Sequence, residues 1–480
     1  MKKFEKNIID NNIIDVFKFN NSVKKFLKET KEKNYSLFAT GVTPHINYLL
    51  TAATFNQNDS FVFYVAPNQY KAHLAYDCFC TICGYDNINL YVADEQLAVE
   101  AAVTSNELKF ERLNTIKSII ENKKKIIVTH TTAFLKPLLS YESLKKGVIN
   151  LKTNSEFEIQ DIVKKLIKIG YKRVATTYEV GQFSVRGEVI DVFPCCSDRP
   201  IRINFDFDTI ETIKYFNYQT QFTEEKIEQF NVMPVNEIII WDDLEKIKDD
   251  LKSIEENKNN EIIENDFIDY ENFGATEKLI KYIKYIDTKA CSISEYVSEK
   301  IVFYEDIKKQ SEAYDAAIGD IYNFYSGKYP FKNIEMQIYF DFYSYDYNVK
   351  KKIFLGAKDE SLKGIEVMGI YGFDGYKVIN YQNDFKMFSS DLKEKKFTVI
   401  ALRNKEKIKL VADILDNNEI DYIITDGFNI NFSKVNILLS QNAISFGIAS
   451  LIEVITEDEI FKQAKSDRVK YRSVKEKTSN

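Results

Sequence analysis

The stretch LFATGVTPHINYLLTAA, residues 37–53, reads as a strand, a turn and a helix, the arrangement in which many parallel α/β sheets hold a nucleotide. A phosphate-binding P-loop has the pattern G-x-x-x-x-G-K-[ST]: its backbone N–H groups surround the phosphates, its lysine contacts them and its hydroxyl holds Mg²⁺. Counted from Gly41, the last three positions of the pattern are Ile46, Asn47 and Tyr48. Isoleucine takes up the room of a phosphate, asparagine carries no cation, and tyrosine is too bulky for the hydroxyl position. The loop therefore predicts a degenerate nucleotide site without function.

Apolar segments that alternate with helical segments follow the loop. FVFYVAP (61–67), INLYVA (88–93) and KKIIVTH (124–130) are apolar runs, and patterns typical of helices lie between them. This alternation predicts a parallel sheet with helices on both faces. Later in the chain, KIVFYED (300–306) reads as one more buried strand, and residues 331–345 look like another. The first domain is therefore expected to use two separate segments of the chain.

The domain boundaries follow from where this pattern stops. Residues 1–136 and 236–345 are expected to form the first α/β domain. Residues 137–235 are expected to be an inserted α+β domain, and residues 346–461 a third, smaller α/β domain. Residues 462–480 hold seven lysines and arginines and are expected to be a basic linker or tail.

The inserted domain is expected to combine one amphipathic helix with an antiparallel sheet. The helix is predicted over residues 158–169 and is followed by Gly170, which suits the position after a helix end. Its apolar face is made of Ile159, Ile162, Val163, Leu166 and Ile167. Turn residues separate the short strands that follow. We expect Ile162 and Leu166 to be buried against this sheet, together with Val189 or Ile190.

Composition limits the class of protein. Of the 480 residues 45% are apolar, enough for several cores, and the net charge of −7 argues against a surface that binds nucleic acid throughout. No apolar run is long enough to span a membrane, so we expect a cytoplasmic protein. Cys78, Cys80 and Cys83 follow helical apolar spacing, and the three histidines stand far apart. We expect buried helix cysteines and no metal site.

Several stretches, in order along the chain, resemble the N-terminal region of the bacterial transcription-repair coupling factor family (Mfd), part of which is similar to the repair helicase subunit UvrB. They are GVTPHINYLLTAA, VAPNQYKAHLAYD with YVADE, GYKRVATTYEVGQFSVRGEVIDVFP, RPIRINFDFDTIETIKYFNYQTQ and SLIEVITEDEIF. The third is the most specific, because its G-x-[FY]-x-x-R-G-x-x-x-D-x-F-P pattern is long and irregular. The resemblance implies a RecA- and UvrB-like first domain.

The resemblance also explains the degenerate loop. UvrB has a functional P-loop at this place, whereas the first domain of the family has a similar fold in which the nucleotide-binding residues have been lost. Glu305 and Asp306 lie where the family places acids like those of a Walker B motif, and we expect a solvated pair at a strand end rather than Mg²⁺ ligands. We therefore assign no catalytic residue, metal or cofactor to this chain.

A complete family member continues into a domain that binds RNA polymerase, a DNA translocase motor that uses ATP and Mg²⁺, and a regulatory domain. This chain reaches Asn480 without an intact Walker A or DExH motif. We expect a fragment of a longer protein or a naturally short paralogue, monomeric and not itself an enzyme. Its contacts to RNA polymerase and DNA would then belong to regions absent here.

The inserted domain resembles the UvrB domain that binds UvrA. The resemblance implies that Arg186 and Arg202 are interface arginines, and a guanidinium on a sheet surface suits a partner carboxylate. The alternative is that Arg186 pairs within its own hairpin. The family has two phenylalanines after the second arginine, whereas this chain has Phe205 and Asp206. Phe207 replaces the missing ring only if a local bulge moves it.

These observations favour a non-catalytic scaffold that recruits UvrA to stalled transcription for nucleotide excision repair. One alternative is an ATP-dependent, UvrB-like helicase subunit, and the degenerate loop argues against it. The other is a DNA-binding repair protein. The acidic net charge, and the lack of an aromatic-rich hairpin insertion of the kind UvrB uses to hold DNA, argue against that one.

Overall fold

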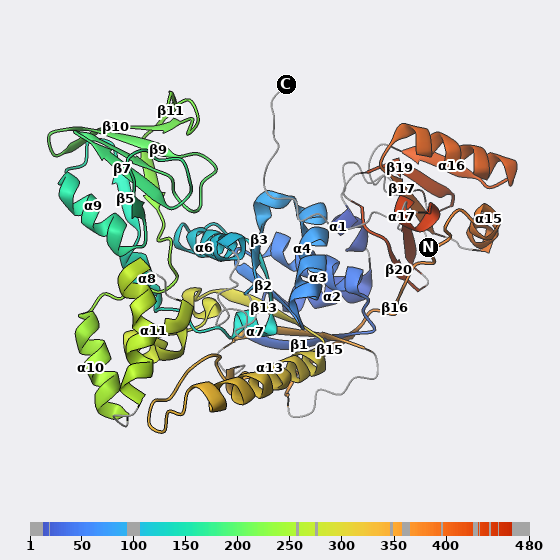
Figure 1. Ribbon diagram of the computed structural model, residues 1–480. Coiled ribbons are helices and arrows are strands. Elements are labelled where there is room, and N and C mark those ends of the chain that lie inside the picture. Colours follow the sequence, from blue (N-terminus) through green and yellow to red (C-terminus); the bar gives the residue numbers. More distant parts are fainter. Residues whose placement is uncertain are drawn as a thin grey trace.

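The computed structural model describes residues 13–18, 20–93, 106–255, 259–273, 277–345, 349–357, 365–394, 397–425, 431, 433–440, 443–449 and 451–462. In this part of the chain a central α/β domain lies between an inserted α+β domain and a third α/β domain (Figure 1). The expected multidomain α/β fold is thus confirmed. The predicted basic tail lies, apart from its first residue, outside the described residues. None of the described helices is long and apolar enough to cross a membrane.

A seven-stranded parallel sheet forms the centre of the first domain. In order across the sheet, its strands are β15 (Gly369–Gly372), β1 (Tyr35–Thr40), β14 (Lys351–Gly356), β13 (Lys300–Glu305), β2 (Phe61–Ala66), β4 (Ile126–His130) and β3 (Ile88–Tyr91). Most of these strands are continuous apolar runs because helices cover both faces. The helices on one face are α1 (Ile13–Phe17), α2 (Asn21–Glu29), α3 (Pro44–Gln57) and α4 (Gln69–Cys83). Those on the other are α6 (Asn106–Ile120), α7 (Thr131–Phe134) and α13 (Ile307–Lys328).

The first sheet extends beyond the boundary expected at residue 345. β14 pairs in parallel with both β1 and β13, and β15 pairs with the other edge of β1. The sheet therefore uses the chain as far as Gly372, and the third domain starts after it. Sequence pattern identifies strands but not their partners, because strand partners are chosen by contacts between distant segments.

Residues 331–345 do not form the strand that their composition suggests. Their backbone bonds to helical parts of the first domain instead: Phe340 donates its N–H to the carbonyl oxygen of Leu135, at 2.9 Å. The segment crosses the helical layer and ends in the short helix α14 (Phe342–Tyr345).

The inserted domain packs α9 (Ile159–Lys168) against a six-stranded sheet. In order across the sheet, its strands are β11 (Thr223–Ile227), β10 (Thr209–Phe216), β9 (Ile201–Asp206), β8 (Val189–Val192), β7 (Gln182–Arg186) and β6 (Lys172–Arg173). All neighbouring strands are antiparallel except β6 and β7. Where the chain enters and leaves the domain, β5 (Ile149–Lys152) pairs with β12 (Gln229–Val232).

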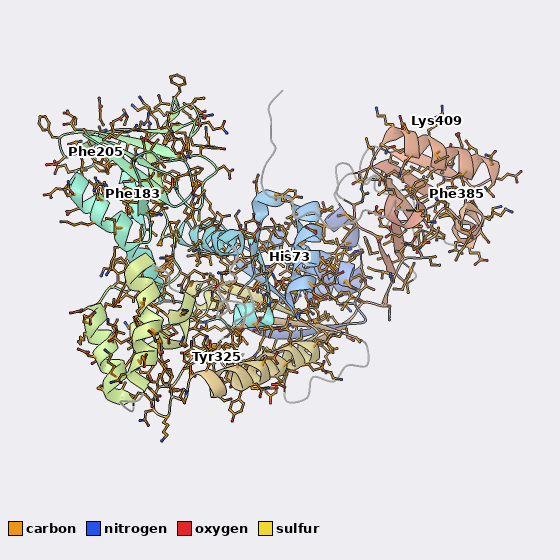
Figure 2. All side chains as sticks on the ribbon, viewed as in Figure 1. His73, Phe183, Phe205, Tyr325, Phe385 and Lys409 are labelled. Atoms are coloured by element: carbon orange, nitrogen blue, oxygen red, sulfur yellow. The ribbon has the colours of Figure 1, made fainter. Side chains whose placement is uncertain are left out.

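The core of the inserted domain lies between α9 and one face of this sheet. Ile162, Leu166 and Ile190 are buried as expected, and Gly170 follows the helix with a φ of +97°. Phe183 and Phe205 fill the same core (Figure 2). Ile167 differs from the expectation, because it lies one step past the edge of the buried stripe and is 55% exposed. The other face of the sheet carries polar residues.

Residues 241–330 form a mostly helical layer beside the first sheet. Its helices are α10 (Leu244–Ile254), α11 (Asn260–Phe273), η3 (Glu277–Tyr282), α12 (Ile283–Ile286) and η4 (Ile293–Tyr296), followed after β13 by α13, and α8 (Tyr141–Lys146) lies beside them (Figure 1). α4 carries the three clustered cysteines; Cys80 is buried, and burial raises the pKa of its thiol to about 12. The expectation of buried helix cysteines is thus met by Cys80, whereas Cys78 and Cys83 are half-buried.

A buried ion cluster holds the segment that leaves the inserted domain against the first domain. Glu237, just after the inserted domain, accepts from Arg112 Nε of α6 at 2.7 Å and from Lys136 Nζ at 2.9 Å. Burial raises the pKa of the Glu237 carboxyl, but the two cations outweigh it and hold the pKa well below its usual range. The ionised form of Glu237 is thus built into this joint.

The third domain has a mixed six-stranded sheet. In order, its strands are β16 (Gly375–Tyr376), β20 (Phe446–Ile448), β21 (Ile452–Thr456), β17 (Thr398–Leu402), β19 (Val435–Leu439) and β18 (Tyr422–Thr425), and its helices are α15 (Phe385–Glu394), α16 (Lys405–Asn417) and α17 (Glu457–Ile460). Thr456 and Glu459 form a capping box at the start of α17. The acidic residues of α17 therefore have a structural role.

Candidate functional site

The degenerate nucleotide loop is folded as a tight turn into α3, but its residues are buried. Gly41 has a φ of +67°, a conformation that suits glycine, and Thr43 caps the helix. Ile46, Asn47 and Tyr48 are all buried, and Ile46 is completely inaccessible. The backbone turn of a P-loop persists, but side chains occupy the space around it.

The ring of Tyr48 fills the place that the sequence comparison assigns to the Mg²⁺-binding hydroxyl. It packs edge-on against Tyr64 of β2 and Phe79 of α4, with ring centroids 5.6 and 5.3 Å apart. These contacts belong to the apolar core between the sheet and its helices. This position is part of the core, and a packed aromatic ring stands where a working loop has a small hydroxyl residue.

The start of the third domain closes the loop from outside. The backbone N–H of Gly375 donates to the carbonyl oxygen of Gly41 at 2.8 Å, and that of Phe373 donates to Thr40 at 3.1 Å. A Cβ on Gly375 would lie 2.3 Å from Ile46 Cδ1, so the two segments are in close contact. The loop that holds phosphate in other proteins here holds a neighbouring domain.

The two acids at the end of β13 have different environments. Glu305 is 8% exposed, and burial raises the pKa of its carboxyl. Asp306 caps α13 by accepting from Lys309 N at 3.1 Å. The expectation of a solvated pair is wrong for Glu305, because its carboxyl is buried beside Tyr64.

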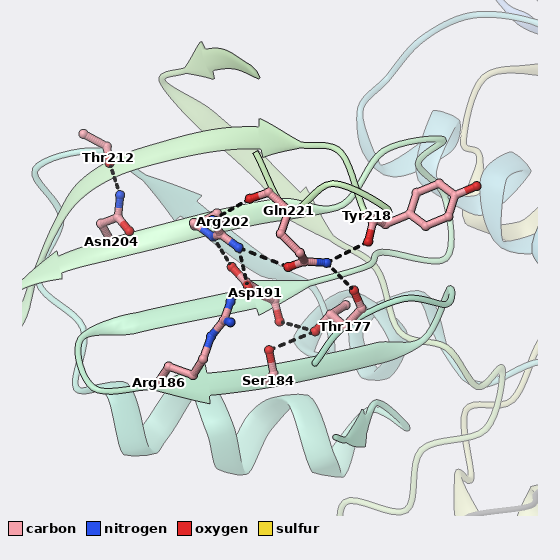
Figure 3. A network of polar contacts seen from close by, with 9 residues as sticks. All are labelled: Thr177, Ser184, Arg186, Asp191, Arg202, Asn204, Thr212, Tyr218 and Gln221. Carbon is pink, nitrogen blue, oxygen red and sulfur yellow. Dashed lines mark hydrogen bonds and ion pairs between the residues drawn. The ribbon is translucent and has the colours of Figure 1, made fainter. Parts of the chain in front are cut away.

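Three charged side chains from neighbouring strands meet on the polar face of the inserted sheet (Figure 3). Asp191 of β8 lies opposite Arg202 of β9 in the antiparallel register. Its Oδ1 accepts from Arg202 Nε at 2.7 Å, and its Oδ2 from Arg202 Nη2 at 2.9 Å. Arg186 Nη2, from the end of β7, donates to the same Oδ2 at 2.5 Å. One carboxylate thus holds both arginines, and we call this group the arginine triad.

The two arginines of the triad differ in how far they are available to a partner. The Arg186 side chain is 49% exposed, that of Arg202 is 16% exposed, and that of Asp191 is 1% exposed. Arg202 also donates to the carbonyl oxygen of Gln221 at 3.1 Å, and its guanidinium lies 4.7 Å from the ring centre of Phe216. The donors of Arg202 are therefore largely used inside the domain, whereas Arg186 presents an open edge. Arg186 pairs across its own hairpin and still reaches solvent.

The aromatic residues predicted beside the arginines are also placed differently from one another. Phe205 is 4% exposed and belongs to the core, so a partner on the surface does not reach its ring. Asp206 is exposed at the end of β9. Phe207 follows it in the hairpin turn, with a φ of +53° and a side chain 81% exposed. The turn thus points this ring outward, and the β9–β10 pairing that it connects shifts its register between Ile210 and Thr212.

Asp191 is the residue of the triad that sequence analysis did not recognise, because it reads as part of the turn after its strand. A signal was present: strand alternation puts Asp191 on the same face as Arg186 and Arg202 once the two hairpins are paired. Gln221, which links Arg202 to a neighbouring loop, had no such signal because it lies in a connection.

Comparisons with known proteins show what this chain resembles. The family model described as the UvrB interaction domain matches residues 149–238, which include the arginine triad. The transcription-repair-coupling factor of Bacillus subtilis (strain 168) is 24% identical over 493 aligned residues, which cover 98% of this chain and 42% of the relative. That of Staphylococcus aureus (strain bovine RF122 / ET3-1) is 27% identical over 244 residues, or 50% of this chain and 21% of the relative. The chain thus spans less than half the length of these relatives. Residues 149–238 therefore match the UvrB interaction domain, in a chain that is similar along nearly its whole length to the transcription-repair-coupling factor of Bacillus subtilis.

Proposed function

We propose that this chain is a non-catalytic scaffold that recruits UvrA to stalled transcription for nucleotide excision repair. The inserted domain supplies the contact, and the first domain holds the segment that leaves it. The match to the UvrB interaction domain and the similarity to transcription-repair-coupling factors support this proposal. Contacts to RNA polymerase and DNA, and the use of ATP and Mg²⁺, are properties we propose for other parts of a complete relative.

The open guanidinium edge of Arg186 is the observation that carries the proposal. Asp191 fixes the orientation of this side chain, so that little side-chain entropy is lost when a partner binds. A carboxylate of UvrA that approaches from solvent can pair with the remaining N–H groups of Arg186. Phe207 lies exposed in the turn that follows β9, next to the hairpin end that bears Arg186, and adds apolar area beside the charge. Arginine and aromatic residues are the usual anchors of protein interfaces.

The environment of the degenerate loop supports a scaffold rather than a helicase. ATP binding there would require the third domain to leave Gly41, and the ring of Tyr48 to leave the core. Isothermal titration calorimetry with Mg-ATP at millimolar concentration is expected to show no saturable site. Saturable binding that is lost when Glu305 is changed to glutamine would favour the helicase alternative.

The binding test compares Arg186→Ala with a matched control. Arg403 of the third domain is also half-exposed, at 44%, and is also paired with an acid, Asp458. We expect Arg186→Ala to weaken binding of the cognate UvrA by about 2 kcal/mol, roughly thirtyfold in Kd, and Arg403→Ala to leave it unchanged. Biolayer interferometry with immobilised UvrA measures both. Equal affinity of wild type and Arg186→Ala, with both proteins folded, would remove the named site from the proposal.

A further inference from the structure

Two exposed aromatic rings lie on the loops next to the arginine triad. Tyr178, in the loop between β6 and β7, is 52% exposed, and Phe222, just before β11, is 76% exposed. A single exposed ring on a protein surface needs no explanation. These two differ from scattered rings because Phe222 directly follows Gln221, and Tyr178 directly follows Thr177, whose carbonyl oxygen accepts from the Gln221 side chain.

Gln221 connects both loops to the triad (Figure 3). Its Nε2 donates to the carbonyl oxygens of Thr177 at 3.5 Å and Tyr218 at 2.7 Å. Its own carbonyl oxygen accepts from Arg202 Nη1 at 3.1 Å, and its Oε1 lies 3.4 Å from Arg202 Nη2. Gln221 has a φ of +63°, a conformation that these bonds hold in place. Arg202 thus fixes the backbone immediately before Phe222.

The loop of Tyr178 is fixed from below by the sheet. Thr177 is buried, and its hydroxyl donates towards Ser184 Oγ at 3.1 Å and the carbonyl oxygen of Asp191 at 3.4 Å. The backbone N–H of Tyr178 donates to Gln182 Oε1 at 3.1 Å. The loop is therefore ordered before any partner arrives, and a rigid loop that displays an aromatic ring loses little entropy on binding.

We propose that Tyr178 and Phe222 extend the docking surface of Arg186, and that UvrA covers both rings with an apolar recess beside the carboxylate that pairs with Arg186. This inference rests on the proposed function and names a second part of the same contact. The proposal rests on an unbroken series of hydrogen bonds from Arg186 to the two loops. Asp191 accepts from both arginines, and Arg202 donates to Gln221. Gln221, which precedes Phe222, in turn donates to Thr177, which precedes Tyr178. Arg202 acts here as a positioning residue, because it holds the loops and does not itself need to touch the partner.

The test uses the whole 480-residue chain and immobilised UvrA. Phe222→Ala and Tyr178→Ala are each expected to raise the Kd for UvrA about tenfold. Tyr178→Phe, which keeps the ring, is expected to bind like wild type. Tyr85→Ala is the matched control, since that ring is 70% exposed on the first domain. Melting temperatures should not change, because both rings are largely in solvent.

The outcomes separate this inference from the proposed function. If Arg186→Ala weakens binding while Tyr178→Ala and Phe222→Ala bind like wild type, the extended surface is refuted and the recruiting function stands. If the wild-type chain does not bind UvrA, the recruiting function fails and the extended surface fails with it. The extended surface is supported if Tyr178→Ala and Phe222→Ala weaken UvrA binding while Tyr85→Ala and Tyr178→Phe bind like wild type.

Discussion

Replacing Arg202 by alanine is expected to destabilise the inserted domain far more than replacing Arg186. Arg202 bonds to both oxygens of Asp191, at 2.7 and 2.9 Å, and to the carbonyl oxygen of Gln221 at 3.1 Å. The Asp191 side chain is 1% exposed in this structure, and without Arg202 its remaining ionic partner is Arg186. A nearly buried charge would then be only partly neutralised.

The magnitude follows from burial. Removing one member of a buried ion pair costs about 3–5 kcal/mol, because the other charge is left desolvated. Arg186 keeps part of this charge neutralised, so we expect Arg202→Ala to cost about 3 kcal/mol. Arg186 is 49% exposed, and solvent screens its pairing, so Arg186→Ala should cost below about 1 kcal/mol. The two variants thus separate stability from binding: Arg202→Ala should mainly destabilise the inserted domain, and Arg186→Ala should mainly weaken binding of UvrA.

Hydrogen exchange followed by mass spectrometry measures this difference locally, in peptides that span β8 and β9. A loss of about 3 kcal/mol corresponds to exchange faster by about a hundredfold. The double variant Asp191→Ala/Arg202→Ala should lose less unfolding free energy than the two single variants lose together, because no unpaired carboxylate then remains. If Arg202→Ala and Arg186→Ala speed exchange equally, and by less than about threefold, the assignment of Arg202 as the buried support of the triad is refuted.

Two further predictions test the core and the joint of the inserted domain. Leu166→Ala should lower the unfolding free energy, measured by urea denaturation, by about 3 kcal/mol because Leu166 is fully buried. Ile167→Ala, at an exposed position, should change it by less than about 0.5 kcal/mol. Equal losses would contradict the described buried face of α9. Since Arg112 and Lys136 lower the pKa of Glu237, its ionisation stabilises the fold above the unfolded-chain value of about 4.3, and this stabilisation is lost as pH falls towards the native pKa. The Glu237→Gln variant should therefore have a lower unfolding free energy than wild type at neutral pH, and its unfolding free energy should fall less steeply in acid. If its unfolding free energy depends on pH as that of wild type does, the ionised state of Glu237 at this joint is refuted.

Local pattern and chemistry sufficed for much of this protein. Continuous apolar strands such as residues 61–67 identified the parallel sheet, because only a strand covered on both faces lacks polar alternation. The period of α9 and the position of Gly170 identified that helix and its end. Ile46, Asn47 and Tyr48 predict a degenerate nucleotide loop, since binding phosphate depends on particular residue types at fixed spacing. These are properties of residues near one another in the chain.

Tertiary structure decided the rest, because it depends on contacts between segments far apart in the chain. The first sheet reaches Gly372 because β14 lies between β1 and β13, a pairing that no local pattern encodes. The degenerate loop became a joint because Gly375 of a distant segment packs on it. Sequence could name Arg186 and Arg202 as equal candidates, but only the strand register brings Asp191 between them and makes one arginine an internal support and the other an open edge. The free energy of a charged side chain depends on its burial and its partners, and both are set when the strands pair.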